Sequence, residues 1–232
     1  MHFQHADDIW RDFPELNVGA LFIDNVRSEV SVEDHVRRFQ AIAEDRLGAG
    51  SESDLPEIQA WRRTFARMGL KPTQYRSASE ALLRRFRKEG SLPAIHPLID
   101  LCNAASLASA IPIAVFDLSN VSDFLHVRRA VGNETYLTFA DETENPEPGE
   151  VIFADAEGRA HARRWTNRQS GHSAIRPQTA HALIVAEAMH ETAREDVARL
   201  MTALSEAISA AWSTRPSMAM LDCSSPRFDF SI

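Results

Sequence analysis

A run of apolar residues interrupted by a polar stripe, residues 96–110, constrains this chain more than any other feature. The stripe consists of Asp100, Asn103 and Ser106, which recur at every third position and therefore share one face of a helix. The other positions are too apolar for a solvent-exposed helix, so we expect this helix to be buried. Burying an Asp and an Asn is costly unless hydrogen bonds compensate. These two side chains therefore either hold neighbouring backbone or line a pocket.

The composition is that of an ordinary globular protein. The chain has 232 residues, 44% of them hydrophobic and 25% charged, which suits one large domain with a substantial core. Cys102 and Cys223 are far apart, and Cys102 lies in the apolar helix, so we expect no disulfide and a reducing compartment. We find neither a leader-like start nor an apolar run of about eighteen residues, and therefore expect a cytoplasmic protein that does not enter the membrane.

Charge is unevenly distributed along the chain. The net charge of −8 disfavours indiscriminate binding to nucleic acid. Between residues 61 and 90, however, nine Lys or Arg residues stand against two acids. This segment is either a pair of solvated helix faces or a phosphate-facing surface for RNA, and the sequence leaves both interpretations open.

The first half of the chain has a mainly helical pattern. An apolar run at 17–24 predicts a buried strand. Apolar spacing between turn-type residues predicts three helices before the apolar one, at 31–48, 55–68 and 77–90. A capped start is expected at Ser31, and Ser77 with Glu80 predicts a capping box. Pro97 suits the first turn of the apolar helix.

Beyond Pro112 the pattern changes from helical to extended. Short apolar runs predict strands at 113–116, 124–127, 135–139, 150–155 and 160–165, the last two forming a hairpin. Residues 141–149 are expected to be an acidic loop. The pattern from Thr179 to Trp212 predicts a long alanine-rich helix with a break, followed from Pro216 by a tail that is weakly ordered or docked elsewhere. The sequence therefore predicts an α+β fold.

Polar groups that packing does not obviously require gather at five places. The densest is 163–173, where Arg, Asn, Gln, Ser and His accompany a glycine. Such a turn can bind a carboxylate, ribose or phosphate, because guanidinium groups bind oxyanions bidentately and glycine lets backbone amides approach a ligand. The other four places are Tyr75–Ser77, Asp100 with Asn103, Asp117, and Gly149–Glu150.

A purely structural interpretation of this polar turn is equally open. In it Trp165 packs in the core while neighbouring arginines form ion pairs that hold the sheet together. The arginines are Arg164 and Arg168, and the acids expected to pair with them are Asp100, Asp117 and Glu150.

Several common catalytic patterns do not occur in the sequence. We find no Gly-rich phosphate loop, no nucleophile elbow and no His pair at metal-ligand spacing. His172 and Ser173 adjoin, but neighbours in sequence seldom form a nucleophile and base. No metal site is singled out, and we interpret His161 as a strand residue. We therefore expect no metal and no cofactor.

Six short motifs follow one another between about residues 60 and 190. They are Arg76-Ser77, Asp100-x-x-Asn103, Pro112 to Asp117, Gly149-Glu150-Val151, Asp155 in a hairpin, and Arg164-Trp165-x-x-Arg168-Gln169. In this order they resemble the B3/B4 domain of the bacterial phenylalanyl-tRNA synthetase β subunit, and more closely the free-standing B3/B4 proteins. The resemblance implies a layered α+β domain with a mixed β-sandwich core at 59–212. A strand and helix of the same globule precede it at 1–58, and a C-terminal tail follows at 213–232.

In the synthetase, this domain hydrolyses tyrosine wrongly esterified to the phenylalanine tRNA. The resemblance thus implies an aminoacyl-ester pocket in which water is the nucleophile and the protein positions substrate and stabilises charge. It places Cys102 and Asn103 at a pocket-lining Thr-Asn pair and Gly171 in a glycine-containing loop. Glu187 corresponds to the carboxylate that binds the tyrosine hydroxyl. Ala114 departs from the family, which has His there.

Three hypotheses for function follow. The first is a stand-alone hydrolase that removes a wrong amino acid from tRNA in trans, with Asp100 and Asn103 as catalytic residues. Asn103 is expected to face the ligand, while Asp100 also ties its helix to the turn after Trp165. The residues expected to bind substrate are Arg76, Asp117, Glu150, Arg164, Trp165, Arg168, Gln169, Gly171 and Glu187. The second hypothesis is a non-catalytic module that binds RNA, a nucleotide or an amino acid on the same scaffold. The third is an interaction module that forms a homo-oligomer through the C-terminal helix and tail.

Overall fold

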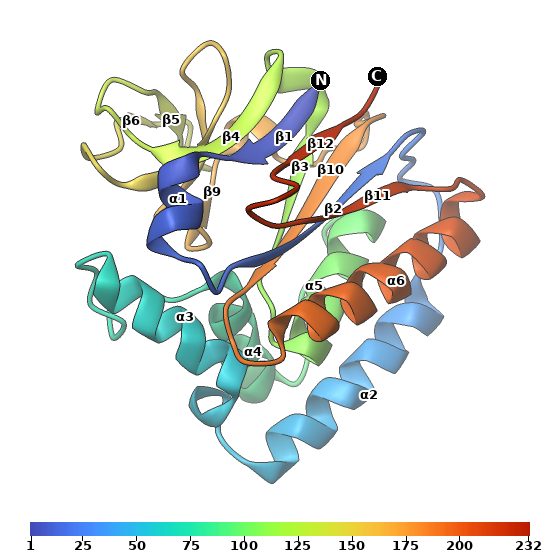
Figure 1. Cartoon of the computed structure of the whole chain (residues 1–232). Helices are drawn as coiled ribbons and strands as arrows, with labels where there is room; N and C mark the ends of the chain where they lie inside the picture. Colours follow the sequence, from blue (N-terminus) through green and yellow to red (C-terminus); the bar gives the residue numbers. More distant parts are fainter.

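Two stacked β-sheets and a layer of helices build the molecule in a computed structural model that describes residues 1–232 (Figure 1). The inner sheet has the order β11-β2-β10-β3, and all its pairings are antiparallel. Its strands are β2 (Asn17–Ile23), β3 (Ile113–Asp117), β10 (Ala182–Ala188) and β11 (Ser217–Leu221). β10 lies between β2 and β3 and is buried over its whole length.

The outer sheet has six strands in the order β12-β1-β4-β7-β8-β9. Only β1 and β4 pair in parallel. The strands are β1 (His2–His5), β4 (Phe124–Arg129), β7 (Val151–Ala154), β8 (Ala160–Arg163), β9 (Arg168–Gln169) and β12 (Arg227–Asp229). A separate ribbon pairs β5 (Tyr136–Leu137) with β6 (Thr143–Glu144).

Alternation along the inner sheet divides the core into two apolar layers. Leu183 and Val185 of β10 face the outer sheet and pack with Phe3 and Phe153. Ile184, one position along β10, faces the opposite way and packs against the helices. The inner sheet is therefore covered on both faces, which explains why its strands are almost entirely apolar.

The helices lie mainly on one side of the inner sheet, at the lower side of Figure 1. α5 (Pro97–Ser109) and α6 (Ala193–Trp212) pack against the sheet, and α2 (Glu33–Ala49) packs against α5. α3 (Pro56–Arg67) and α4 (Ala78–Glu89) lie beside this layer, and α1 (Asp7–Asp12) follows β1. Single 3₁₀ turns occupy Glu52–Asp54 (η1), Leu118–Asn120 (η2) and Gly171–Ser173 (η3). No helix is both long and apolar enough to cross a membrane.

The local predictions with strong end signals are confirmed. The apolar helix is α5, buried along most of its length with Pro97 in its first turn. The expected hairpin is β7 and β8, and the α+β class holds. Two caps differ from expectation. α2 starts after Val32 without a side-chain cap, and Ser77 accepts the backbone N–H of Glu80 while the Glu80 carboxylate pairs with arginines instead of closing the box.

The predicted helix from Thr179 to Trp212 is wrong in its first part. Residues 182–188 form the central strand β10, and only residues 193–212 form α6. A short apolar run fits either a buried helix or a strand covered on both faces, because neither shows alternation. Here the pairing with β2 and β3 on either side decides in favour of a strand.

Both ends of the chain join the sheets. The tail from Pro216 is docked, with β11 pairing with β2 and β12 with β1, so the weakly ordered alternative is wrong. β1 and α1 were not expected. The predicted strand at 135–139 shrinks to β5, and its partner β6 lies in the segment expected to be a loop.

Candidate functional site

A pocket of about 380 Å³, including space open to solvent, lies where the two sheets meet. The inner sheet contributes Ile113, Ala114 and Glu187, and the outer sheet contributes Phe153, Ala162, Arg168 and Gln169. Pro112, Ala78 and the turn Trp165–Asn167 complete the lining. Mostly apolar walls with a few polar groups are typical of small-molecule sites.

Glu187 is the only acid that lines this pocket, and only 2% of its surface is exposed. Its Oε1 accepts hydrogen bonds from His5 Nε2 at 2.6 Å and from Trp165 Nε1 at 2.8 Å. Its backbone carbonyl accepts from Trp61 Nε1 at 3.2 Å. The two donors to the carboxylate come from β1 and the β8–β9 turn, and the donor to the backbone carbonyl comes from α3, so Glu187 is held from three parts of the chain. Such compensation is what a buried charge requires.

The turn between β8 and β9 brings Trp165 into the core. Arg164 and Trp165 have φ values of 47° and 59°, in the left-handed region, as in the tight turns that suit the twist of a hairpin. Glu150 Oε1 accepts from the backbone N–H of Arg164 at 2.9 Å, and Trp165 N–H donates to the Val151 carbonyl. The fully buried indole then packs edge-on against Phe13 and Trp61.

The same turn is stabilised by a buried ion-pair network. Arg163, with 4% of its side chain exposed, donates to both oxygens of Glu150 at 2.9 and 2.8 Å and to Glu144 at 2.6 Å. Burial opposes ionisation of Glu150, but the hydrogen bonds from Arg163 and from backbone amides outweigh it and lower its pKa. A bidentate pair of this kind fixes the geometry of both side chains.

The structural interpretation of the polar turn was correct for Trp165 but wrong about which arginines pair with the expected acids. Arg163 pairs with Glu150, whereas Arg168 pairs with Glu144 at 3.1 Å and keeps 38% of its side chain exposed. The Arg164 guanidinium lies over the Tyr75 ring, 4.9 Å from its centroid. Successive residues at the end of a strand point to opposite faces. Arg163 therefore reaches Glu150, whereas the side chain of its neighbour Arg164 points elsewhere.

Polar groups beside Arg168 also belong to the pocket lining. Asn167 Nδ2 donates to the Arg76 carbonyl at 2.8 Å, which joins the turn to the start of α4. Gln169 Nε2 donates to the Val115 carbonyl of β3 and so bridges the two sheets. Arg168 is the one cationic residue of the lining, and its side chain stays partly exposed.

Asp100 and Asn103 lie elsewhere. They line a separate pocket of about 560 Å³, including space open to solvent, between α2 and residues 92–94, and it shares no lining residue with the first pocket. Asp100 Oδ1 accepts from the Ile95 N–H at 2.9 Å, and Ser106 Oγ donates to the Ile111 carbonyl at 2.7 Å. The expected tie between Asp100 and the turn after Trp165 is therefore wrong, because Asp100 holds the entry to its own helix.

The remaining predicted residues make structural contacts. Asp117 accepts from the Ser119 N–H at 2.9 Å and from Thr179 Oγ1 at 2.6 Å. Arg76 is one-third exposed and lies 3.3 Å from Glu80. Gly171 starts η3, where a Cβ atom would lie 3.0 Å from the Thr138 carbonyl oxygen. None of these three residues lines the pocket.

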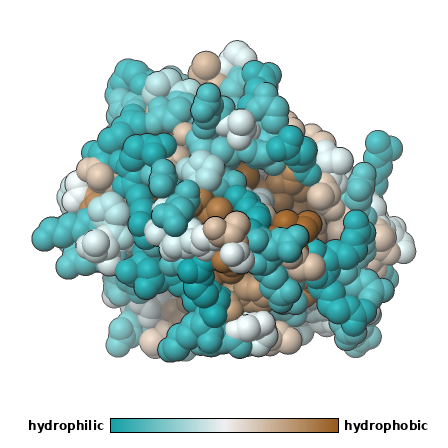
Figure 2. All heavy atoms as spheres, turned by 90° about the horizontal axis from the view of Figure 1, so that it is seen from below, coloured by the Kyte–Doolittle hydropathy of each residue, from teal (hydrophilic) through white to brown (hydrophobic).

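Acids partly neutralise the basic segment. Arg62 and Arg76 pair with Glu80, and Arg85 pairs with Glu89. Glu52 of η1 pairs with two further arginines of α4, Arg84 and Arg87. Seen from below Figure 1, hydrophilic side chains cover most of the surface, with apolar atoms visible in hollows between them (Figure 2).

Sequence reasoning missed two contacts of Glu187, one from His5 to its carboxylate and one from Trp61 to its backbone carbonyl. His5 lies on a four-residue strand near the N-terminus, where burial alternates along His2–His5. Such alternation is a strand signal, but four residues give it little weight. Trp61 falls in the predicted helix at 55–68, but the partner of its indole N–H lies 126 positions away in β10.

The fold is thus an α+β sandwich backed by helices, with a pocket at the junction of its sheets. The model of the B3/4 domain family matches residues 60–210, so the chain belongs to this family. The resemblance expected from the six motifs is therefore confirmed.

Among solved structures, the chain is similar to an N-terminal fragment of the phenylalanyl-tRNA synthetase β-subunit from Pyrococcus horikoshii. The TM-score is 0.49 at 9% sequence identity, over 93% of this chain and 49% of that fragment. The chain therefore spans about half of the fragment. No curated protein sequence matches it.

Proposed function

We propose that this protein hydrolyses the ester of a mischarged aminoacyl-tRNA in trans, with the pocket between the sheets receiving the aminoacyl group. Membership of the B3/4 family supports the reaction class, because the B3/B4 domain of the synthetase hydrolyses such an ester. The observation that carries the proposal is the placement of the Glu187 carboxylate in an otherwise mostly apolar pocket.

The chemistry of the lining supports an aminoacyl ligand. Ala114, Phe153 and Ala162 offer apolar surface to an amino-acid side chain. Oε1 of Glu187 accepts both hydrogen bonds from His5 and Trp165, and no protein group donates to Oε2. This second oxygen is suited to bind an ammonium or hydroxyl group of the ligand. The exposed guanidinium of Arg168 is suited to the phosphate or ribose of the tRNA end.

In the proposed reaction, water attacks the carbonyl carbon of the ester. The bond from that carbon to the ribose oxygen breaks, the ribose hydroxyl recovers a proton, and the free amino acid leaves. The protein accelerates this step by holding the ester in place and by stabilising developing charge.

The same pocket supports a second candidate, a module that binds an aminoacyl or amino-acid ligand without turnover. The observation that favours it is Ala114, which places a methyl group where the synthetase domain has an imidazole. Ala78 and Ala162 likewise supply no group that transfers a proton.

A panel of mischarged tRNAs separates the two candidates. We expect the wild-type chain to release the amino acid from at least one of them and Arg168→Ala to lose at least about tenfold in rate, as for a lost charged contact. The matched control is Asn103→Ala, in the other cavity, which should keep full activity. Intact esters across the panel, together with thermal stabilisation by a free amino acid, would support the binding module instead. Loss of activity in Asn103→Ala would move the site to the cavity beside α2.

A further inference from the structure

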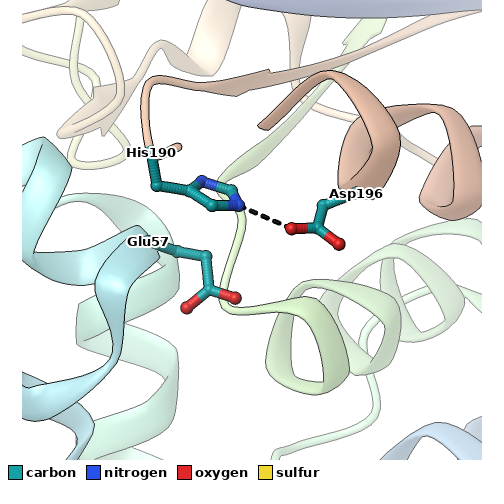
Figure 3. Close-up of side chains that lie close together, drawn as sticks. All are labelled: Glu57, His190 and Asp196. Atoms are coloured by element: carbon teal, nitrogen blue, oxygen red, sulfur yellow. Dashed lines mark hydrogen bonds and ion pairs between the residues drawn. The ribbon is translucent and has the colours of Figure 1, made fainter. Parts of the chain in front are cut away.

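Three side chains that can ligate a metal meet between α3, α6 and the segment that follows β10 (Figure 3). Glu57 lies in the first turn of α3, His190 follows β10, and Asp196 lies in the first turn of α6. Their ligating atoms all lie within 4.8 Å of one another, and His190 Nε2 is 2.8 Å from Asp196 Oδ2. The three groups converge from separate elements, as the residues of an ion site do.

One oxygen of this cluster is buried without a partner. Glu57 is 7% exposed, and its Oε1 accepts from Arg46 Nη2 at 2.7 Å. Its Oε2 is inaccessible to solvent and receives no hydrogen bond. Because buried carboxylate oxygens are nearly always satisfied, this oxygen is available to a donor or a cation.

We propose that Glu57, His190 and Asp196 bind a divalent transition-metal ion, of which Zn²⁺ is the best match. One imidazole nitrogen and two carboxylates form a donor set that Zn²⁺ accepts, and three protein ligands leave a coordination position open. A groove lined by Glu57 and Asp196 leads to the cluster, and its apolar walls include Phe39, Ile42 and Leu200.

Outer contacts already orient the two carboxylates. Arg46 also donates to the Ala108 carbonyl at 2.8 Å, which fixes its guanidinium beside Glu57. Thr192 Oγ1 and Arg199 both donate to Asp196. Supporting groups of this kind orient metal ligands, and the cation takes the place of the hydrogen bond between His190 and Asp196.

The site would connect the helices to the pocket. Glu57 and Trp61 are one turn apart on α3, and Trp61 donates to the backbone of Glu187. His190 lies three residues beyond Glu187 on the same segment. An ion bound here therefore fixes α3 against the end of β10, next to the strand that presents the pocket carboxylate.

Titration calorimetry with ZnCl₂ on the EDTA-treated full chain tests the proposal. We expect one high-affinity ion per chain, and Glu57→Gln and Asp196→Asn should each weaken binding at least about tenfold. Thermal melting of each variant without metal identifies any that fail to fold, and Asp196, the most exposed ligand of the three, is the variant best placed to keep the fold.

Two control variants separate this site from other zinc-binding groups. His2 and His126 have ring nitrogens 2.8 Å apart, and Cys223 is exposed, so either place could bind zinc by itself. We expect the double variant His2→Gln, His126→Gln and the variant Cys223→Ser to keep the site. Binding that is lost in these controls but unchanged in Glu57→Gln would overturn the proposal, as would no binding in the wild type.

Cobalt substitution gives an independent readout. Co²⁺ in the proposed site should show visible d–d bands without the near-ultraviolet charge-transfer band of a thiolate ligand. The bands should disappear in Asp196→Asn. A spectrum that is unchanged in this variant would place the ion elsewhere and contradict the assignment.

Discussion

Strand β10 of the inner sheet is buried along its whole length and carries one ionisable side chain, Glu187, whereas the outer sheet carries many. Some of those in the outer sheet are satisfied close by, as when Arg163 of β8 donates to Glu150, 13 positions earlier in the chain. Glu187 instead depends on His5, 182 positions away, and on Trp165. The comparison teaches that a charge in a doubly covered sheet must be compensated by remote parts of the chain.

This contrast follows from how each sheet is covered. The inner sheet lies between helices and the outer sheet, so both faces of its central strand β10 are buried. The outer sheet has one face toward the core, and the opposite face of β7 and β8 is covered by a smaller apolar cluster that includes Tyr136, so its Arg163–Glu150 ion pair is also buried but finds its partner locally. A ligand that contacts both sheets thus meets a compensated carboxylate on one side and exposed donors on the other.

The largest effect is expected from removing the carboxylate of Glu187 on the central strand of the inner sheet. Glu187→Ala leaves the donors of His5 and Trp165 buried without an acceptor, and we expect a loss of about 3–5 kcal/mol in the free energy of unfolding. Urea denaturation measures this loss. Glu187→Gln, which keeps an acceptor oxygen, should recover part of it, and equal stability of the two variants would argue against the hydrogen-bond explanation.

A smaller loss is expected in the outer sheet. Arg163→Met removes the partner of Glu150, but that carboxylate keeps backbone donors at Glu147 and Arg164. We expect the free energy of unfolding to fall by about 2–3 kcal/mol, the range for hydrogen bonds to charged groups. A decrease larger than that of Glu187→Ala would contradict the prediction that a buried charge costs more to unpair in the inner sheet.

The outer sheet should also make stability depend on pH in a defined window. Burial, followed by the neighbouring charges of His2 and Arg128, lowers the pKa of His126 from 6.5 to about 4. Between these two pH values, the unfolded chain binds a proton at this histidine and the folded chain does not. The free energy of unfolding therefore falls as the pH decreases from 6.5 to about 4. Thermal melting across this window should show a flatter profile for His126→Gln. An unchanged profile would assign the pH dependence to other groups.

A second group of the outer sheet acts at lower pH. Burial of Asp155 opposes its ionisation, yet the His161 ring nitrogen 3.2 Å away and hydrogen bonds from backbone amides lower its pKa from 3.8 to about 2. Its stabilising contribution is present above pH 3.8 and disappears as the pH falls toward 2. Asp155→Asn should flatten the melting profile only in this lower window.

The smallest effect is expected in the helix layer. The Asn103 side chain lines a cavity and receives or donates no hydrogen bond within the chain. Asn103→Ala should therefore change the free energy of unfolding by no more than about 0.5 kcal/mol. A loss of several times that size would show that Asn103 has a structural role like that of Asp100.

The elements predicted from the sequence share strong local signals. α5 has a proline at its start, α4 has a serine cap, and the β7–β8 hairpin has turn residues between two apolar runs. The elements missed or mistaken, β1, β10, β11 and β12, are strands whose evidence lies in their distant partners. Strand pairing depends on contacts between residues that are far apart in the sequence. The apolar run at residues 182–188 fits a buried helix as well as a buried strand, so the sequence pattern could not distinguish the two.

The candidate site divides in the same way. Trp165, Arg168, Gln169 and Glu187 were named from sequence, and the structure brings all four to one pocket. Asp100 and Asn103 were expected with them and lie in another cavity. Helical spacing correctly placed the polar stripe on one face, but spacing does not say which element covers that face.

By itself, the sequence determined the buried helix, the hairpin, the α+β class and the motif order of the B3/4 family. Each of these depends on residues close together in the chain or on their order along it. Only the tertiary structure decided that Glu187 meets His5, that Arg163 takes the place expected for Arg164, and that Glu57, His190 and Asp196 converge. The physical reason is that local dihedral preferences act over a few residues, whereas sheet register and helix packing join positions more than a hundred residues apart.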